Sequence, residues 1–142
     1  MTKPRCVVDT NVLISGALSK HGKPRKVVDF IDASGIILSS QATFEEFETR
    51  IRRKKFDKYF VDPHERKEYI DWIYSLSYPF VEITKEIAEC PDPDDDKFLE
   101  LAVSGNADYL ITGNLKDFPP SPFQGIPILS PAEFLETVLW ET

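Results

Sequence analysis

The sequence predicts a single-domain, three-layer α/β/α protein in which a mostly parallel, five-stranded sheet lies between two layers of helices. Short apolar runs rich in Val and Ile alternate along the chain with segments whose apolar residues recur at helical spacing. This alternation is typical of parallel sheets whose strands are joined by right-handed helical crossovers. With 142 residues, of which 42% are hydrophobic and 29% charged, the chain has the size and composition of one domain over residues 1–142.

Five runs have the length and composition of short strands. Cys6, Val7 and Val8 are apolar and end at Asp9, as in a strand that is buried on both faces. Residues 80–83 alternate between apolar and polar side chains, which is typical of a strand with one exposed face. The expected strands lie at residues 6–8, 36–38, 80–83, 109–112 and 126–129.

The segments between these strands carry helix signals. Ser40 and Ser130 are good N-caps, and Asp62 followed by Pro63 has the pattern of a helix start. Gly105 is a typical residue for a helix C-terminus. The expected helices cover about residues 12–18, 24–34, 41–55, 63–78, 95–104 and 131–139.

The charges are unevenly distributed. The net charge is −7, which by itself argues against non-specific binding to nucleic acid. Ten of the seventeen basic residues nevertheless lie in two short segments, residues 20–26 and 50–58. These two segments are therefore candidate surfaces for an anionic partner.

Several features indicate the cellular location. No long uncharged apolar run is present, so no membrane span is expected. The first strand follows Pro4 so closely that no room is left for a signal peptide. Cys6 and Cys90 lack the spacing of metal-binding pairs, which favours reduced structural thiols. Together these features predict a cytoplasmic protein.

Acidic and amide side chains recur where a strand ends or a helix begins. Because the carboxyl ends of parallel strands meet at one edge of a sheet, such side chains are expected to converge on one crevice. The residues in question are Asp9 after the first strand, Glu45, Glu46 and Glu48 in the helix after the second, Asp94 to Asp96 before the fourth, and Asn114 and Asp117 after the fourth.

Helical spacing discriminates among three consecutive aspartates. At about 100° per residue, Asp95 shares a face with Phe98 and is expected to point toward the sheet. Asp96 falls on the solvent side together with Lys97. Asp94 is expected to be the N-cap of the helix.

Each acid also has a purely structural interpretation. Asp9 could cap the following helix, Glu46 could pair with Arg50 one turn later, and residues 94–96 could serve only the helix dipole. Several inward-facing acids at one edge, however, raise one another's pKa unless a cation lies between them. Oxygen ligands without histidine or cysteine favour Mg²⁺ or Mn²⁺ over zinc.

Four segments, taken in order, resemble the motifs of PIN-domain ribonucleases. Residues 8–13, Val-Asp-Thr-Asn-Val-Leu, are similar to the opening of that family. Ser40, with Glu46 six residues later, is similar to its second acidic motif, and residues 94–102 are similar to the third. Residues 108–114 resemble the strand that carries the fourth. The likeness therefore spans nearly the whole chain.

The resemblance implies a PIN-like fold and a metal-dependent endoribonuclease, often the toxin of a toxin–antitoxin pair. It implies that Asp9, Glu46, Asp95 and Asn114 form the catalytic and metal-binding set, with Mg²⁺ or Mn²⁺ as cofactor. The family usually has aspartate where this chain has Asn114. An asparagine can bind Mg²⁺ through its carbonyl oxygen but brings no charge, and Asp117 is a possible substitute.

Further residues would assist these ligands. Candidates for orienting ligands or water are Thr10, Asn11, Thr112 and Asp117. Contacts to the RNA backbone are expected from Lys23, Arg25, Lys26, Arg50, Arg53 and Lys54. The expected partners are RNA, a protein antitoxin and a second copy of the chain in a homodimer.

Other functions fit part of the pattern. A PIN-like module that binds metal or RNA without cutting would account for Asn114. A phosphotransferase of the haloacid-dehalogenase kind would use Asp9 as a nucleophile, but that chemistry usually requires an aspartate where this chain has Asn11. A response-regulator receiver is less favoured still, because no paired acids accompany Asp9.

Overall fold

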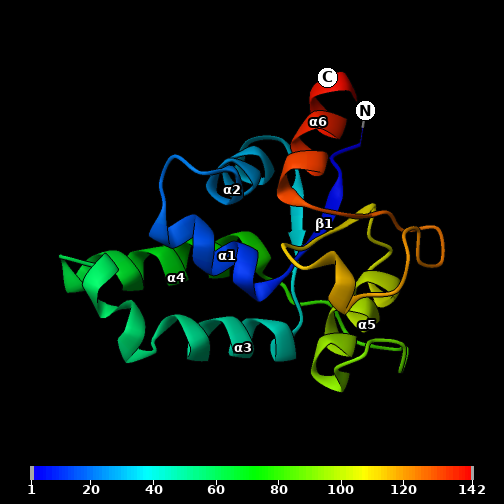
Figure 1. The fold of residues 1–142 in the computed structure, drawn as a ribbon, viewed down its shortest axis with the longest axis horizontal. Helices are drawn as coiled ribbons and strands as arrows, with labels where there is room; N and C mark the ends of the chain where they lie inside the picture. The colour runs from blue at the N-terminus through cyan, green and yellow to red at the C-terminus, as the bar shows by residue number, and fades with distance from the viewer. Residues whose placement is uncertain (1, 142) are drawn as a thin grey trace.

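The computed structural model describes residues 2–141 and contains a parallel sheet with helices on both faces (Figure 1). The strands are β1 (Arg5–Val8), β2 (Ile36–Leu38), β3 (Tyr109–Ile111) and β4 (Ile128–Leu129). All neighbours are parallel, in the order β2-β1-β3-β4. The predicted three-layer α/β fold is confirmed, but the sheet in residues 2–141 has four strands instead of five.

Helices connect and flank these strands. The α-helices are α1 (Thr10–Leu18), α2 (Lys23–Ser34), α3 (Gln41–Ile51), α4 (Pro63–Ser77), α5 (Asp96–Ser104) and α6 (Pro131–Glu141). Short 3₁₀ helices are η1 (Lys54–Tyr59), η2 (Pro93–Asp95) and η3 (Leu115–Asp117). Among the boundaries that differ from the sequence prediction, α1 begins directly after Asp9, and α3 ends at Ile51, short of residue 55.

Three of the predicted helix caps are present. The hydroxyl of Ser40 accepts a hydrogen bond from the backbone N–H of Thr43 at 3.1 Å. The carboxylate of Asp62 accepts one from the N–H of His64 at 2.9 Å. Ser130 and Glu133 exchange side-chain to backbone bonds in a capping box at the start of α6.

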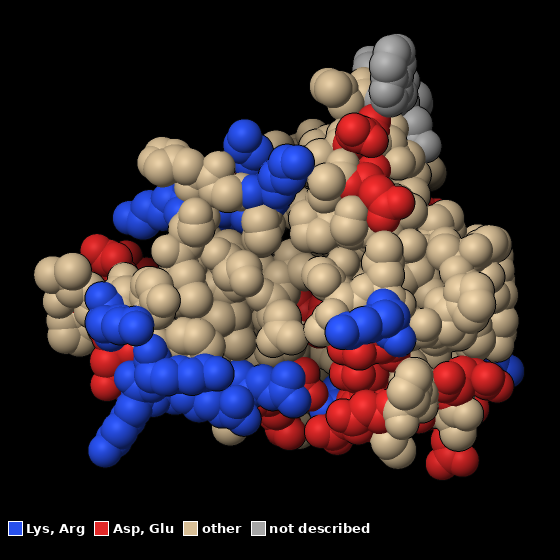
Figure 2. Space-filling view, viewed as in Figure 1, with Lys and Arg blue, Asp and Glu red and all other residues tan. Residues whose placement is uncertain are grey.

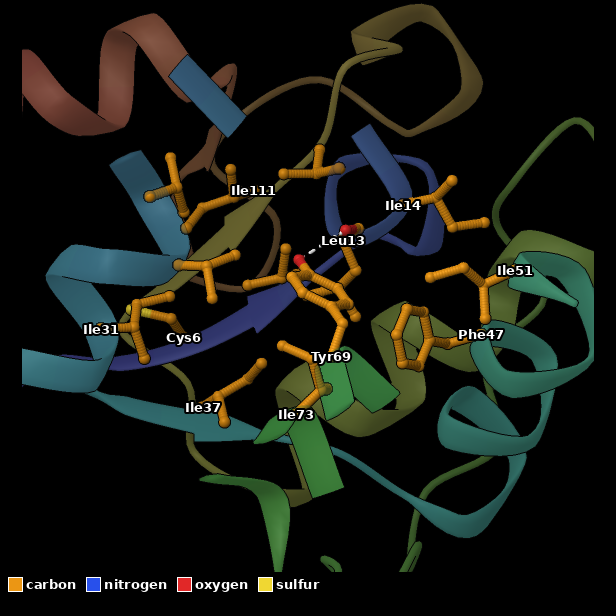
Figure 3. Close-up of a cluster of buried hydrophobic side chains, with 14 of the residues drawn as sticks. Cys6, Leu13, Ile14, Ile31, Ile37, Phe47, Ile51, Tyr69, Ile73 and Ile111 are labelled. Atoms are coloured by element: carbon orange, nitrogen blue, oxygen red, sulfur yellow. Dashed lines mark hydrogen bonds between the residues drawn. The ribbon is translucent and has the colours of Figure 1, made fainter. Parts of the chain in front are cut away.

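Two hydrophobic cores hold the layers together, one on each face of the sheet. The larger packs α1, α2, α3, α4 and α6 against the face that carries Cys6 (Figure 3). Tyr69 lies within it, and its hydroxyl donates a hydrogen bond to the carbonyl of Leu13 at 2.7 Å. The smaller core packs α5 against the opposite face, which carries Val7. The strand β1 is therefore buried on both faces, and Asp9 follows its carboxyl end.

The predicted strand at residues 80–83 is wrong. The chain between α4 and α5 runs in an extended but irregular path, and its amides find isolated acceptors instead of a neighbouring strand. These acceptors are side chains and one backbone carbonyl, and they satisfy the amides that strand pairing would otherwise satisfy. The bonds run from Val81 to the carbonyl of Ser39, from Thr84 to the hydroxyl of Ser104, and from Ile87 to the carboxylate of Glu100.

None of the helices in residues 2–141 combines the length and the apolar composition that crossing a bilayer requires.

Candidate metal centre

Asp9 is buried at the carboxyl end of β1, with 6% of its surface exposed. It occupies the N-cap position of α1, but its side chain makes no capping hydrogen bond. Its carboxylate instead accepts a hydrogen bond from the hydroxyl of Thr112 at 2.8 Å. Burial raises the pKa of Asp9, and the charge of Glu46 adds to this, while the Thr112 hydroxyl and nearby amides act in the opposite direction.

Asp95 ends η2, at the N-cap position of α5, and lies near four other acids. Its pKa is raised to about 6, first by desolvation and then by the charges of Asp9, Asp92, Asp117 and Glu46. A cation between these carboxylates would relieve their repulsion. The structure therefore brings Asp9, Glu46, Asp95 and Asp117 within electrostatic reach of one another.

Glu46 points from α3 toward the same region, and its side chain is 9% exposed. Its Oε1 accepts a hydrogen bond from the hydroxyl of Thr10 at 2.7 Å and pairs with Arg50 at 3.3 Å. Its Oε2 forms an ion pair with Lys97. The helical pair with Arg50, which the sequence offered as a structural interpretation of Glu46, thus exists together with a longer-range one.

Asn114 lies three residues after the end of β3. It is exposed, and its backbone N–H donates to the hydroxyl of Thr112 at 3.0 Å. With Asn11, Ser15 and Gly113 it lines a hollow of about 230 Å³. Thr112 therefore links the backbone of Asn114 to the carboxylate of Asp9.

Two orientations predicted from helical spacing are wrong. Asp96 is buried, because its Oδ1 accepts the backbone N–H groups of Glu89 and Cys90 at 3.0 and 2.8 Å. Desolvation acts to raise the pKa of Asp96, but these hydrogen bonds outweigh it and the pKa is lowered. Asp94 is not the N-cap; its side chain is 70% exposed, and Asp92 caps η2 instead.

Lys97 was assigned to the solvent side from its helical phase, yet its side chain is only 22% exposed and contacts Glu46. A weak signal of this role exists in the sequence. A lysine in the first turn of a helix lies at the positive end of the helix dipole, where a cation is disfavoured. Such a lysine is expected to have an acidic partner outside its own helix.

The chemistry of the donor set fits a hard divalent cation. Carboxylates and an amide or hydroxyl oxygen are the ligands that Mg²⁺ and Mn²⁺ prefer. In residues 2–141, no three Asp, Glu, His or Cys side chains are already gathered closely enough to hold an ion. The charge of Asp9 raises the pKa of Asp95. Glu46 accepts a hydrogen bond from Thr10 and forms ion pairs with cationic side chains.

A sequence model of the PIN domain matches residues 5–116, which includes β1, α3, α5 and β3. The chain belongs to the PIN domain family. PIN domains are typically nucleases, and such nucleases generally use divalent metals. The matched region contains Asp9, Glu46, Asp95 and Asn114.

The chain is also similar to the uncharacterized protein MJ1680 of Methanocaldococcus jannaschii. The two are 28% identical over 113 residues, which cover 79% of this chain and 72% of the relative. The relative is described as uncharacterized, so the likeness adds no activity to that expected of a PIN domain.

The basic segments of this PIN domain lie on different helices. Lys23 and Lys26 are exposed on α2, whereas Arg25 stacks on Trp72, with its guanidinium 5.0 Å from the ring centre. Arg53 and Lys54 are exposed after α3. Figure 2 shows a band of Lys and Arg along the edge formed by α3 and η1, next to a concentration of acids around α5. The structure thus confirms the dipolar charge distribution.

The basic band reaches the acids through a hollow of about 350 Å³. The residues that line this hollow include Glu46, Lys97, Arg50 and Arg53. An anionic chain bound along η1 and the end of α3 would therefore pass directly beside Glu46.

Proposed function

We propose that this PIN domain is a Mg²⁺- or Mn²⁺-dependent endoribonuclease that hydrolyses phosphodiester bonds at the carboxyl edge of the sheet. The observation that carries the proposal is the convergence of Asp9, Glu46, Asp95 and Asp117 from four different elements. Desolvation, and then the repulsion of the neighbouring acids, raises the pKa of Asp95 to about 6. Structural acids alone gain nothing from such an arrangement, whereas a cation site requires it.

The chain's own residues have distinct roles in this proposal. Asp9 and Asp95 would hold the divalent ion, assisted by Glu46 and by the amide oxygen of Asn114. Thr112 orients the Asp9 carboxylate through its 2.8 Å hydrogen bond. When bound, a divalent ion supplies an activated water and neutralises charge that develops on the phosphodiester.

Other polar residues are placed to support this set. Thr10 orients Glu46 through a 2.7 Å hydrogen bond. Asp117, which acts on Asp95 electrostatically, is a candidate for an additional acidic ligand next to the neutral Asn114. Asn11 lines the hollow that contains Asn114, where it could orient water or a nucleotide.

Binding of the RNA backbone would follow the basic residues that lead to the acids. Arg50 and Arg53 line the hollow beside Glu46, and Lys54 continues the band beyond it. Lys23, Arg25 and Lys26 would form a second contact on α2, with Arg25 contributing less because it is stacked on Trp72. These segments concentrate positive charge in a chain whose net charge is −7.

The direct test is an RNA cleavage assay. The purified chain is incubated with single-stranded RNA, structured RNA and single-stranded DNA of the same sequence, in Mg²⁺, Mn²⁺ or EDTA. Asp9→Asn keeps the shape of the side chain and removes its charge. Asp71→Asn is the matched control, because Asp71 is a surface acid 61% exposed on α4.

The proposal predicts internal cleavage of RNA that requires the metal, is lost in Asp9→Asn and persists in Asp71→Asn. Cleavage that is unaffected by EDTA and by Asp9→Asn would contradict it. Metal-dependent RNA binding without any product would instead support a non-catalytic PIN module, and preferential cleavage of DNA would overturn the assignment to RNA.

We propose further that the cellular role is that of a toxin held in check by a protein antitoxin, and that the chain forms a homodimer. The support is the behaviour of the family, in which PIN domains often pair with antitoxins. Induced expression in bacteria should slow growth, and Asp9→Asn should not. Sedimentation of the purified chain tests the dimer, and an undisturbed growth rate despite active enzyme would contradict the toxin role.

A further inference from the structure

Both carboxylate oxygens of Glu46 already have partners within the protein. Its Oε1 receives the hydroxyl of Thr10 at 2.7 Å and the guanidinium of Arg50 at 3.3 Å. Its Oε2 forms an ion pair with the ammonium group of Lys97. Both side chains of this pair are largely buried, with 9% of Glu46 and 22% of Lys97 exposed.

The ammonium group and a divalent ion compete for the same oxygen. Two cations a few ångströms apart repel strongly where solvent is largely excluded, and Glu46 is such a place. Glu46 therefore cannot serve fully as a ligand while Lys97 remains on Oε2. The absence of a gathered set of three ligands in residues 2–141 is consistent with this competition.

We propose that Lys97 is the resident counter-ion of the metal-free site, and that it must leave Glu46 before a divalent cation is fully coordinated. This inference rests on the proposed metal-dependent function and adds to it a positioning residue that sets the affinity for the metal. The ion pair keeps Glu46 oriented and neutralised while the metal is absent, and it lowers metal affinity by the free energy needed to break it.

Lys97 has a second acceptor within reach when it leaves. Its Nζ lies 4.0 Å from the carboxylate of Asp94, which is 70% exposed. Both residues line the hollow that also contains Arg50 and Arg53. A rotation of the lysine side chain toward Asp94 would open Oε2 and place the ammonium group where a phosphate of bound RNA would lie.

The test is a titration of the full-length, metal-free protein with Mn²⁺, followed by the EPR signal of the free ion. Lys97→Met keeps the length and apolar stem of the side chain and removes the competing charge. Glu46 retains Thr10 and Arg50 as partners, so folding is expected to persist and is checked by circular dichroism. Because Lys97→Met removes this partly buried ion pair, it is expected to lower the Kd for Mn²⁺ about five- to tenfold.

Two comparisons separate competition at Glu46 from a general loss of positive charge. Arg53→Gln removes an exposed cation from the same hollow and should change Kd by less than about twofold, because solvent and salt screen it. In a Glu46→Gln background, Lys97→Met should also change Kd by less than about twofold. Lys97→Arg keeps the charge and should retain weak, wild-type-like binding.

The outcomes distinguish this inference from the proposed function. If wild type binds Mn²⁺ and Lys97→Met binds it with the same or lower affinity, the counter-ion role is wrong and the metal site stands. If Lys97→Met tightens Mn²⁺ binding equally in the wild-type and the Glu46→Gln backgrounds, the counter-ion role is also wrong. If neither wild type nor any variant binds Mn²⁺, the proposed metal-dependent function itself fails.

Discussion

Replacement of Asp95 by asparagine should stabilise the metal-free protein at neutral and alkaline pH. The Asp95 carboxylate lies near the charges of Asp9, Asp92, Asp117 and Glu46, and its pKa is raised from 3.8 to about 6. An amide of the same shape removes that repulsion. A substitution at a proposed catalytic position is thus expected to increase stability while it destroys function.

The magnitude follows from the pKa. A shift of two units corresponds to about 3 kcal/mol at most, at about 1.4 kcal/mol per unit. Asp95 is only half-buried, so screening by solvent reduces the expected gain to about 1 kcal/mol. For a chain of 142 residues this raises Tm by about 3 °C.

The pH dependence has a definite sign. Between pH 4 and 6 the folded wild type binds more protons at Asp95 than the unfolded chain does, so its stability falls as the pH rises through this window. Asp95→Asn lacks this titration. Its advantage over wild type should therefore be absent near pH 4 and complete above pH 7.

The measurement is urea unfolding in EDTA at pH 4.5 and pH 8, for wild type, Asp95→Asn and Asp94→Asn. Asp94 is the matched control, because it is the adjacent aspartate and is 70% exposed. A loss of stability in Asp95→Asn at pH 8, or a gain of the same size at both pH values, would refute the electrostatic account of this site.

Three further predictions concern neighbouring residues. Asp96→Ala should destabilise the fold by about 1–3 kcal/mol, because the amides of Glu89 and Cys90 lose their acceptor; an unchanged urea midpoint would contradict this. Thr112→Val should weaken Mn²⁺ binding about tenfold, because it removes the 2.8 Å hydrogen bond to the Asp9 carboxylate. Equal Kd values for the variant and wild type would show that this bond does not orient the carboxylate. The double change of Arg53 and Lys54 to glutamine should weaken RNA binding and reduce the slope of log K against log salt by about 1.4, because each phosphate contact on a single strand contributes about 0.7. Filter binding from low to moderate salt measures this slope. An unaltered slope would mean that the RNA binds elsewhere.

Local signals predicted the parts of the fold that depend on neighbours in the sequence. Ser40, Asp62 and Ser130 cap helices as expected, because a cap is formed by residues within three positions of one another. The run from Cys6 to Val8 is a buried strand because β-branched residues flanked by polar ones rarely adopt another structure in an α/β chain.

The failures share a physical cause, which is the long loop between α4 and α5. Residues 80–83 alternate like a strand, but the backbone N–H of Val81 bonds only to the carbonyl of Ser39. Further along the loop, side chains of α5 accept the N–H groups of Thr84 and Ile87. The same loop covers the outer face of α5 and buries Asp96. Helical phase gives a direction relative to the helix axis, and it does not reveal which loop will lie there.

The candidate site was only partly accessible to sequence reasoning. Asp9 and Asp95 could be proposed because each lies at a strand end or helix start, and topology brings such positions together. Helical phase does not choose among the glutamates of α3, so Glu46 depended on the resemblance to the PIN motifs. The pairing of Lys97 with Glu46 joins residues 51 positions apart and depends on how α3 packs on α5. Spacing within either helix carries no information about that contact.

The most direct test of the metal centre is an anomalous difference map from a crystal of the protein soaked in Mn²⁺. The account predicts a peak about 2.2 Å from carboxylate oxygens of both Asp9 and Asp95, with Lys97 displaced from Glu46. A map with no peak between Asp9 and Asp95 in crystals that hold Mn²⁺ elsewhere would contradict it.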